Sequence, residues 1–314
     1  MAMIFLIGSG AGLVAALLFG AVATVSPLAL LLSYLAPLPV LIAALGWNHR
    51  SGLAAAVAGS LACALFLAPA AGAVFAIAVA LPAWWLAYLA LLGRADEAGR
   101  LEWYPLGRVL LWIGATAALI TLIGAVALGP SYGEYRAALE VLIRAMIGAE
   151  LTPALPQQAE VEQFVGLVAG AVPAVAAMTF VYMLTINLWI AAFTVRLSQR
   201  LPRTWPSIPD TMMPRQTLVI TGFACVGVAV LPAFPGLAAT AVLGGMAAAL
   251  SLQGLAAIHV ATRGNRARPA LLGLLYLSLL LLSVWVLVVL AIVGVVAIAM
   301  RRPASARPAI PKTD

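Results

Sequence analysis

The chain has 314 residues, of which 65% are hydrophobic and only 9% are charged, and its mean hydropathy is +1.12. Soluble domains carry about 25% charged residues, so this composition excludes a water-soluble globular domain and indicates a membrane protein. The net charge of +7 does not indicate nucleic-acid binding, because the basic residues are scattered over the loops and form no long run with interleaved aromatics.

The apolar segments predict an all-α fold, a polytopic transmembrane helix bundle that forms a single domain over residues 1–300. Runs of about 18 residues or more favour spanning helices over barrel strands, which alternate over about 10 residues. The expected spans are residues 4–24, 28–47, 52–68, 72–92, 109–128, 164–196, 216–231 and 237–261. A further apolar block, residues 270–300, would be about 45 Å long as one helix, against about 30 Å of hydrocarbon. It is either one tilted helix or a hairpin of two short helices that bends near Ser283.

Residues 129–162 leave the hydrocarbon between the fifth and sixth spans. Ser131 and Glu134 form a capping-box signature, and Glu140 and Arg144 form an i,i+4 pair on the polar face of the helix that follows. This pattern predicts an amphipathic helix on the membrane surface. Its apolar face is expected to consist of Tyr135, Leu139, Leu142 and Met146.

The charges in the loops predict the orientation. With the N-terminus in the cytoplasm, Arg50 and the basic loops at residues 94–108, 196–215 and 263–268 lie inside, as the positive-inside rule requires. The segment 129–162 then lies in the periplasm, with five Glu against two Arg. A hairpin in the last apolar block returns the basic tail, residues 301–314, to the cytoplasm, and we prefer it to a single crossing. We expect a multi-pass protein of the bacterial inner membrane with a disordered cytoplasmic tail.

The chemistry that the sequence lacks is equally informative. Every Asp, Glu, Lys and Arg lies in a loop or at a predicted helix end, whereas proton pumps, ion-coupled transporters and intramembrane metalloproteases need ionisable groups at membrane depth. No phosphate-binding loop, H-E-x-x-H or G-x-S-x-G motif occurs. We therefore expect no enzyme activity, no catalytic or metal-binding residue and no cofactor. Cys63 and Cys225 lie in apolar runs and are expected to be buried free thiols.

A ladder of four small residues, Gly8, Gly12, Ala16 and Gly20, recurs at every fourth position of the first span. Such residues share one helix face and let another backbone approach closely. The ladder therefore either docks a partner subunit or packs against a neighbouring helix of the same chain.

Candidate ligand-binding residues lie in the second, sixth and eighth spans. Pro37 and Pro39 distort the second span and free backbone groups, which at membrane depth are tolerated only where protein or a cavity satisfies them. The alternative is a purely structural kink. Asn187 and Gln253 are buried amides that need hydrogen-bond partners, and each either contacts a ligand or holds helices together. Together they would form a polar patch if their helices adjoin. We interpret His259 as an interfacial residue at a helix end.

Three stretches of the sequence resemble a known family. The first contains SPLAL at residues 26–30, YLAPLP at 34–39 and LGW at 45–47, the second is Arg50 followed by SGLAAA, and the third is QGLAAIHV at residues 253–260. These runs resemble the YybS-like family of uncharacterised bacterial membrane proteins over nearly the whole chain. That family is distantly similar to the substrate-binding S subunits of energy-coupling-factor vitamin transporters, which bind a nutrient and dock on a shared energising module. The resemblance implies a small-molecule ligand of unknown identity and a docking role for the ladder, and it implies no ligand residue.

Two functional hypotheses follow. The first is an S-subunit-like transporter component that binds a small molecule, lacks its own energy source and meets an energising or other membrane subunit in the lipid bilayer. The alternative is a membrane scaffold or assembly protein with no ligand. A polar-lined pocket among the first, second, sixth and eighth spans would favour the first hypothesis, and a solid core would favour the second.

Overall fold

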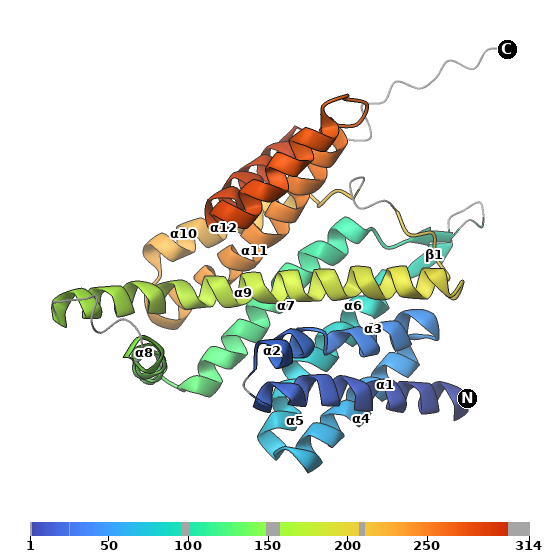
Figure 1. Cartoon of the computed structure of the whole chain (residues 1–314), viewed down its shortest axis with the longest axis horizontal. Coiled ribbons are helices and arrows are strands. Elements are labelled where there is room, and N and C mark those ends of the chain that lie inside the picture. Colours follow the sequence, from blue (N-terminus) through green and yellow to red (C-terminus); the bar gives the residue numbers. More distant parts are fainter. Residues whose placement is uncertain are drawn as a thin grey trace.

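The computed structural model describes residues 2–24, 26–95, 99, 101–148, 158–206 and 211–300. The expected tail, residues 301–314, and residues 149–157 of the segment after the fifth span lie outside this part. Figure 1 shows an α-helical bundle with one small strand pair. The elements are α1 Ala2–Gly20, η1 Ala21–Thr24, α2 Pro27–Tyr34, α3 Pro37–Gly46, α4 His49–Phe66, α5 Pro69–Phe75, η2 Ala76–Ala80, α6 Leu81–Ala90, β1 Gly93–Ala95, β2 Leu101–Trp103, α7 Leu106–Leu128, α8 Tyr132–Gly148, α9 Gln158–Leu197, α10 Gln216–Val230, α11 Ala233–Ala261 and α12 Arg268–Ala299.

The expected all-α membrane bundle is confirmed. Within the described residues, eight helices are long and apolar enough to cross a membrane, and α12 is one of them. α10 has only 15 residues, about 22 Å of helix, so the span expected at residues 216–231 falls short of the hydrocarbon thickness. The expectation for Cys225 was wrong, since this residue of α10 is exposed, whereas Cys63 is buried, and both are free thiols.

Local sequence signals set the helix starts. The Ser26 hydroxyl accepts a hydrogen bond from the Ala29 amide at 3.1 Å, and the Asn48 side chain accepts one from the Ser51 amide at 3.1 Å. Proline occupies the first turn of α2, α3, α5 and α12, where its missing N–H leaves no bond unmade. Pro37 divides the second span into α2 and α3, and the π-helical turn η2 separates α5 from α6 in the fourth span.

The small-residue ladder of α1 packs against α4 of the same chain. A Cβ atom added at Gly8 would collide with the carbonyl oxygen of Ser51, and one added at Gly12 would collide with that of Ala55. The Ser51 hydroxyl also donates to the Ile4 carbonyl across the two helices at 3.1 Å. The contacts therefore match the helix-packing interpretation of the ladder. A docking role stays a prediction, and α4 already covers this face.

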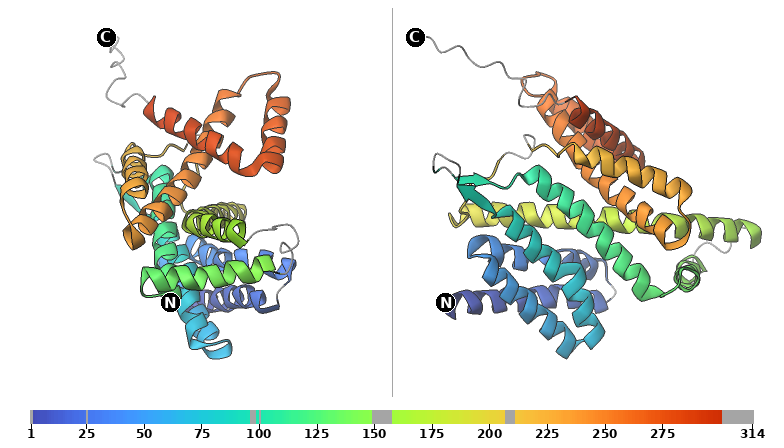
Figure 2. Two further views of the ribbon diagram at one scale, coloured as in Figure 1. Left: turned by 90° about the vertical axis from the view of Figure 1, so that its left-hand side faces the viewer. Right: turned by 180° about the vertical axis from the view of Figure 1, so that it is seen from behind.

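The last apolar block is a hairpin rather than one tilted helix. Ser283 has φ 9° and ψ −81°, outside the helical region, and divides α12 into two helices. The left panel of Figure 2 shows the chain folding back at this point, and in Figure 1 both ends of α12 lie at the same end of α11. The second half crosses α11 closely, because Gly254 and Gly294 each face backbone atoms of the other helix.

α8 begins with the expected capping box. The Ser131 amide donates to the Glu134 carboxylate at 3.0 Å, and the Glu134 amide donates to the Ser131 hydroxyl at 3.2 Å. Figure 1 shows α8 nearly end-on and across the direction of α9, as expected for a helix at a membrane surface. The ion pair differs from the expected one, because Glu140 pairs with Arg136 at 3.0 Å, one turn earlier than Arg144.

The apolar face of α8 is also rotated from the expected one. Tyr135, Leu139 and Ile143 are buried against α7, α9 and α11, whereas Leu142 and Met146 are 51% and 81% exposed. One row of apolar side chains of α8 packs against the protein, and the remaining apolar side chains are exposed. The expected and the observed apolar rows both have helical spacing, so periodicity alone could not show which of them faces the protein.

The loops segregate to two ends of the bundle in the predicted groups. At one end Arg200 stacks over the Trp47 ring at 4.7 Å, and the loop before α7 forms a small hairpin, β1 and β2, closed by Arg94 and Glu102 at 2.8 Å. At the other end the Tyr132 ring packs on Phe234 with centroids 5.9 Å apart. The basic loops therefore share one end and α8 lies at the other.

Close packing of α1 on α4 gives a matched pair of variants. Gly12→Ala should lower the free energy of unfolding by about 1–3 kcal/mol, because the added methyl group meets backbone. Gly10→Ala should leave stability unchanged or raise it by up to about 1 kcal/mol, because Gly10 has no atom within 4 Å of an added Cβ. Thermal unfolding of the two variants in detergent measures the difference, and equal midpoints would contradict the packing.

If α12 is a hairpin, its C-terminal end lies on the same side of the membrane as its start. Single cysteines replacing Arg266 and Met300, in a chain with Cys63→Ala and Cys225→Ala, should react with an impermeant thiol reagent from the same side of the membrane. A cysteine replacing Gly133 on α8 should react only from the opposite side. Labelling of position 300 together with position 133 would show that α12 crosses once.

Candidate functional site

Asn187 closes the break between α2 and α3. Leu38 donates its amide to Leu35 at 3.0 Å rather than to Tyr34, so the Tyr34 carbonyl has no partner within the helix. Asn187 of α9, which is 2% exposed, donates to that carbonyl at 2.8 Å and to the Met183 carbonyl at 2.8 Å. A protein side chain, not a cavity, therefore satisfies the backbone group freed by the break.

The two candidate prolines lie at the same place. Pro37 begins α3 and is buried, and Pro39 is partly buried one residue after Leu38. Neither proline lines either of the two main cavities among the described residues. Their ligand-binding role stays a prediction, and their observed position is in the packing of α3.

Gln253 holds the segment before α10 against α11. Its side-chain oxygen accepts a hydrogen bond from the Met213 amide at 2.8 Å, and its side-chain nitrogen donates to the Thr211 carbonyl at 3.3 Å. Gln253 is 3% exposed and Met213 is 1% exposed. Asn187 and Gln253 thus bond to different segments and do not form one polar patch, although α9 and α11 adjoin through Tyr182 and Ser251, whose hydroxyls are 2.8 Å apart.

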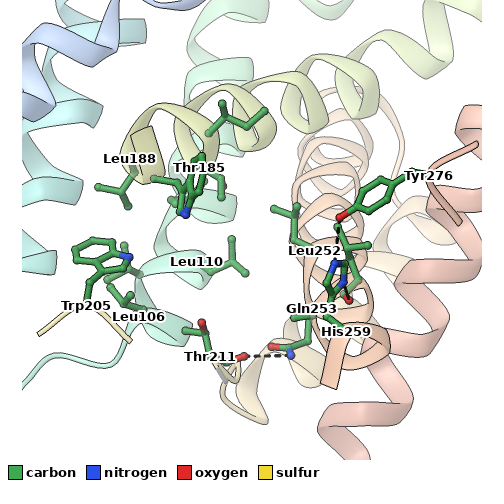
Figure 3. A pocket seen from close by; sticks show the side chains of 16 residues that line it. Leu106, Leu110, Thr185, Leu188, Trp205, Thr211, Leu252, Gln253, His259 and Tyr276 are labelled. Carbon is green, nitrogen blue, oxygen red and sulfur yellow. Dashed lines mark hydrogen bonds between the residues drawn. The ribbon is translucent and has the colours of Figure 1, made fainter. Parts of the chain in front are cut away.

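A half-open cleft of about 560 Å³ lies between α7, α9, α11, the first half of α12 and the segment that follows α9 (Figure 3). Its floor is buried and consists of Val109, Ile113, Leu188, Gln253 and Ala256. Its rim includes Ile186, Trp189 and Tyr276, which are 53%, 47% and 49% exposed. The other lining residues are Leu106, Leu110, Thr185, Trp205, Thr211, Leu252, Leu255 and His259.

The cleft lies where three helices diverge. α11 crosses α7 with Gly245 against the Gly114 backbone, and it crosses α9 with Gly244 against the Ala174 backbone. Helices that touch through glycine are close at that point, and straight rods that cross there separate on either side. The cleft opens on the side toward Gln253, where the lining side chains come from residues beyond the crossing.

The cleft has few polar groups, and they differ in how much of their hydrogen-bonding capacity is unused. His259 lies at the end of α11, as expected, and its Nδ1 is 2.9 Å from the Leu255 carbonyl. Because a carbonyl only accepts, the proton is assigned to Nδ1, and Nε2 then accepts from the Tyr276 hydroxyl at 3.2 Å. The Tyr276 oxygen keeps its lone pairs for a further donor. The Thr185 hydroxyl is buried without a partner.

Arg203 supports the wall of the cleft from behind. It lies between the Trp205 and Trp103 rings, at 5.4 and 5.6 Å, and donates to the carbonyls of Ala90 at 2.6 Å and Tyr104 at 3.2 Å. Burial lowers the pKa of its guanidinium, and the Ala90 carbonyl is at the end of α6, where a cation is favoured. The residue therefore joins α6, the start of α7 and the segment after α9.

Of the residues proposed from sequence, only Gln253 lines the cleft. Sequence reasoning did not select Arg203, Trp205 or Tyr276. The sequence did set Trp205 apart, because it is a single tryptophan between two prolines in a basic loop. It is not part of a group of aromatic residues of the kind that anchors helices at the membrane interface. Tyr276 carried no such signal, since it is one aromatic in a long apolar block.

The structure also bears on metal binding and on the small-residue ladder. Among the described residues, no group of three or more His, Cys, Asp or Glu side chains could hold a metal ion. The ladder residues Gly8, Gly12 and Ala16 are buried under α4, and Gly20 approaches the Leu67 side chain. None of the four lines the cleft.

Comparison with known proteins gives one result. The family model described as "Predicted membrane protein (DUF2232)" matches residues 13–297. No curated protein and no solved structure matches the chain.

The role of Asn187 predicts a stability loss with a matched control. Asn187→Leu should lower the free energy of unfolding by about 1–3 kcal/mol, because the Tyr34 carbonyl is left without a donor. Thr179→Val on the same helix should change it little, because the exposed Thr179 hydroxyl bonds only to the Val175 carbonyl of its own helix. Unfolding midpoints in detergent compare the two variants, and equal stability of Asn187→Leu and the wild type would refute the bond's importance.

Proposed function

Because the chain belongs to the DUF2232 family of predicted membrane proteins, we propose that it is a small-molecule-binding membrane subunit without an energy source of its own, similar in manner to the S subunits of energy-coupling-factor transporters. The proposal includes the inner membrane as its location, a cytoplasmic N-terminus and an energising or other membrane subunit as its partner. The resemblance to YybS-like proteins belongs to the same proposal.

The observation that carries the proposal is the cleft. Small-molecule sites are typically concave, about 300–1,000 Å³ in volume and lined by apolar and aromatic side chains with a few polar groups. The cleft of about 560 Å³ has this size and this lining. A protein that served only as a scaffold would have no need of a cavity with an unpartnered hydroxyl, that of Thr185, on its wall.

The lack of charge supports a passive subunit rather than a pump or an enzyme. Among the described residues that line the cleft there is no Asp, Glu, Lys or Arg, and His259 is the only histidine. Proton relays and ion-coupled transport depend on ionisable groups at such depth. We therefore propose that energy for any transport comes from a partner, and that the protein itself catalyses no reaction.

The basic loops support the orientation. Arg200, Arg203 and Arg94 lie at the end of the bundle that also carries the start of α4 and the turn after α11. α8, with its Glu134 and Glu140, lies at the other end. The positive-inside rule places the first end in the cytoplasm.

The scaffold alternative has one observation in its favour. The ladder of α1 and both buried amides are engaged in contacts within the chain, so the features first considered for binding or docking also serve the fold. Under this alternative the cleft is filled by ordinary membrane lipid, and no particular molecule is retained.

Filling the cleft separates the two functions. Ala256→Phe adds a ring at the buried floor and should reduce any retained small molecule by at least about tenfold in native mass spectrometry of the gently extracted protein, since overpacking leaves no room for it. Val260→Phe adds the same ring at a position of α11 that is 40% exposed and outside the cleft, and it should retain the wild-type adduct. A wild-type protein with no adduct other than bulk lipid would favour the scaffold.

A further inference from the structure

We propose that the ligand of the cleft is a membrane-dissolved amphiphile with one apolar chain and an uncharged head that donates hydrogen bonds, that is, a lipid alcohol. This inference rests on the proposed function and names the ligand class of the same site. It follows from three properties of the cleft: where it opens, how its polarity is distributed and which hydrogen-bonding groups it leaves unused.

The cleft opens toward the bilayer. Its most exposed lining side chains, Ile186 and Trp189 of α9 and Tyr276 of α12, are on the two helices that border the opening. α9 is long and apolar enough to span a membrane, and only 11% of the most apolar window of the α12 hairpin is buried. Exposed apolar side chains at this depth face lipid, so a molecule dissolved in the bilayer reaches the cleft without crossing water.

The cleft, like one leaflet of a bilayer, is polar near the membrane surface and apolar further in. His259 is two residues before the end of α11, about 3 Å along its axis, and Gln253 is eight residues before it, about 12 Å. Thr185 is 12 residues before the end of α9, about 18 Å. The side chains between these levels, among them Ile113 and Leu188, are apolar. An amphiphile therefore enters with its head near the membrane surface and its chain inward, as it lies in the leaflet.

The absence of charge in the lining excludes a charged head. A carboxylate, phosphate or ammonium in the cleft would be removed from water with no Asp, Glu, Lys or Arg among the described lining residues to pair with it, and such burial is strongly unfavourable. Arg203 does not change this, because Trp205 lies between its guanidinium and the cleft.

The unused groups near the head select a donor. The Tyr276 hydroxyl donates to His259, so its oxygen can only accept a further bond. The Gln253 side-chain nitrogen donates to Thr211, and its oxygen has one lone pair left after accepting from Met213. The Gln253 side-chain nitrogen also keeps its second N–H. A hydroxyl head both donates and accepts, so it matches the two acceptors and this donor. An ester or ketone head offers only acceptors and leaves both oxygens unmatched.

Three probes with the same acyl chain test this inference: monoolein, whose head donates through two hydroxyls, methyl oleate, which only accepts, and oleate, which is charged. Each is added to the full-length protein in nanodiscs of phosphatidylcholine, and retention is measured by native mass spectrometry. Monoolein should be retained about five- to tenfold more than either of the others, a ratio that corresponds to one hydrogen bond. Ala256→Phe should lose it and Val260→Phe should keep it.

A conservative variant reports on the head contact directly. Tyr276→Phe keeps the ring and removes the accepting oxygen, so it should reduce monoolein retention by about fivefold and leave methyl oleate unchanged. Tyr34→Phe removes a hydroxyl outside the cleft and should change neither. Methyl oleate or oleate bound as well as monoolein, at a site that Ala256→Phe blocks, would overturn the ligand class while the cleft remained a binding site. No retention of any probe beyond that of Ala256→Phe would overturn the inference, and an absence of every specific adduct would overturn the proposed function as well.

Discussion

The hydrocarbon interior of a bilayer offers no hydrogen-bond partner to a free backbone group, and at three places in this bundle a polar side chain bonds to a backbone group near a helix end. Asn187 donates to the Tyr34 carbonyl where α2 ends. Gln253 accepts from the Met213 amide where the chain returns toward α10. Arg203 donates to the Ala90 carbonyl at the end of α6. Three polar side chains from distant parts of the sequence thus make the interrupted spans stable in lipid.

This use of polar residues determines where binding chemistry can remain. A side chain that saturates a backbone group has little capacity left for a ligand, so the groups to examine are those with an unused bond. In the cleft these include the Thr185 hydroxyl, the lone pairs of the Tyr276 oxygen, and the second lone pair and second N–H of the Gln253 amide. The residues most notable in the sequence, a buried Asn and a pair of prolines, belong to the closure of a helix break.

Local sequence properties predicted the fold class, the helices, the capping box of α8 and the grouping of the loops, because hydropathy, capping and loop charge need no knowledge of tertiary partners. The ladder of α1 marked which face is small, but periodicity does not say that α4 meets it. The bend at Ser283 carries neither proline nor glycine, and only the charge of the tail pointed to a hairpin. The cleft could not be predicted at all, since it depends on how three helices cross.

That crossing explains the position of the cleft. Gly114, Gly244 and Gly245 let α7 and α9 touch the backbone of α11 at one level, and the residues of these three helices that line the cleft lie beyond that level. Larger side chains on α7 and α11 hold the helices apart beyond that level, and the α12 hairpin, drawn onto α11 by Gly254 and Gly294, closes only one side. A helix bundle that packs tightly through glycine at one depth therefore leaves a membrane-facing opening at another, and the unused hydroxyls on its wall decide what can occupy it.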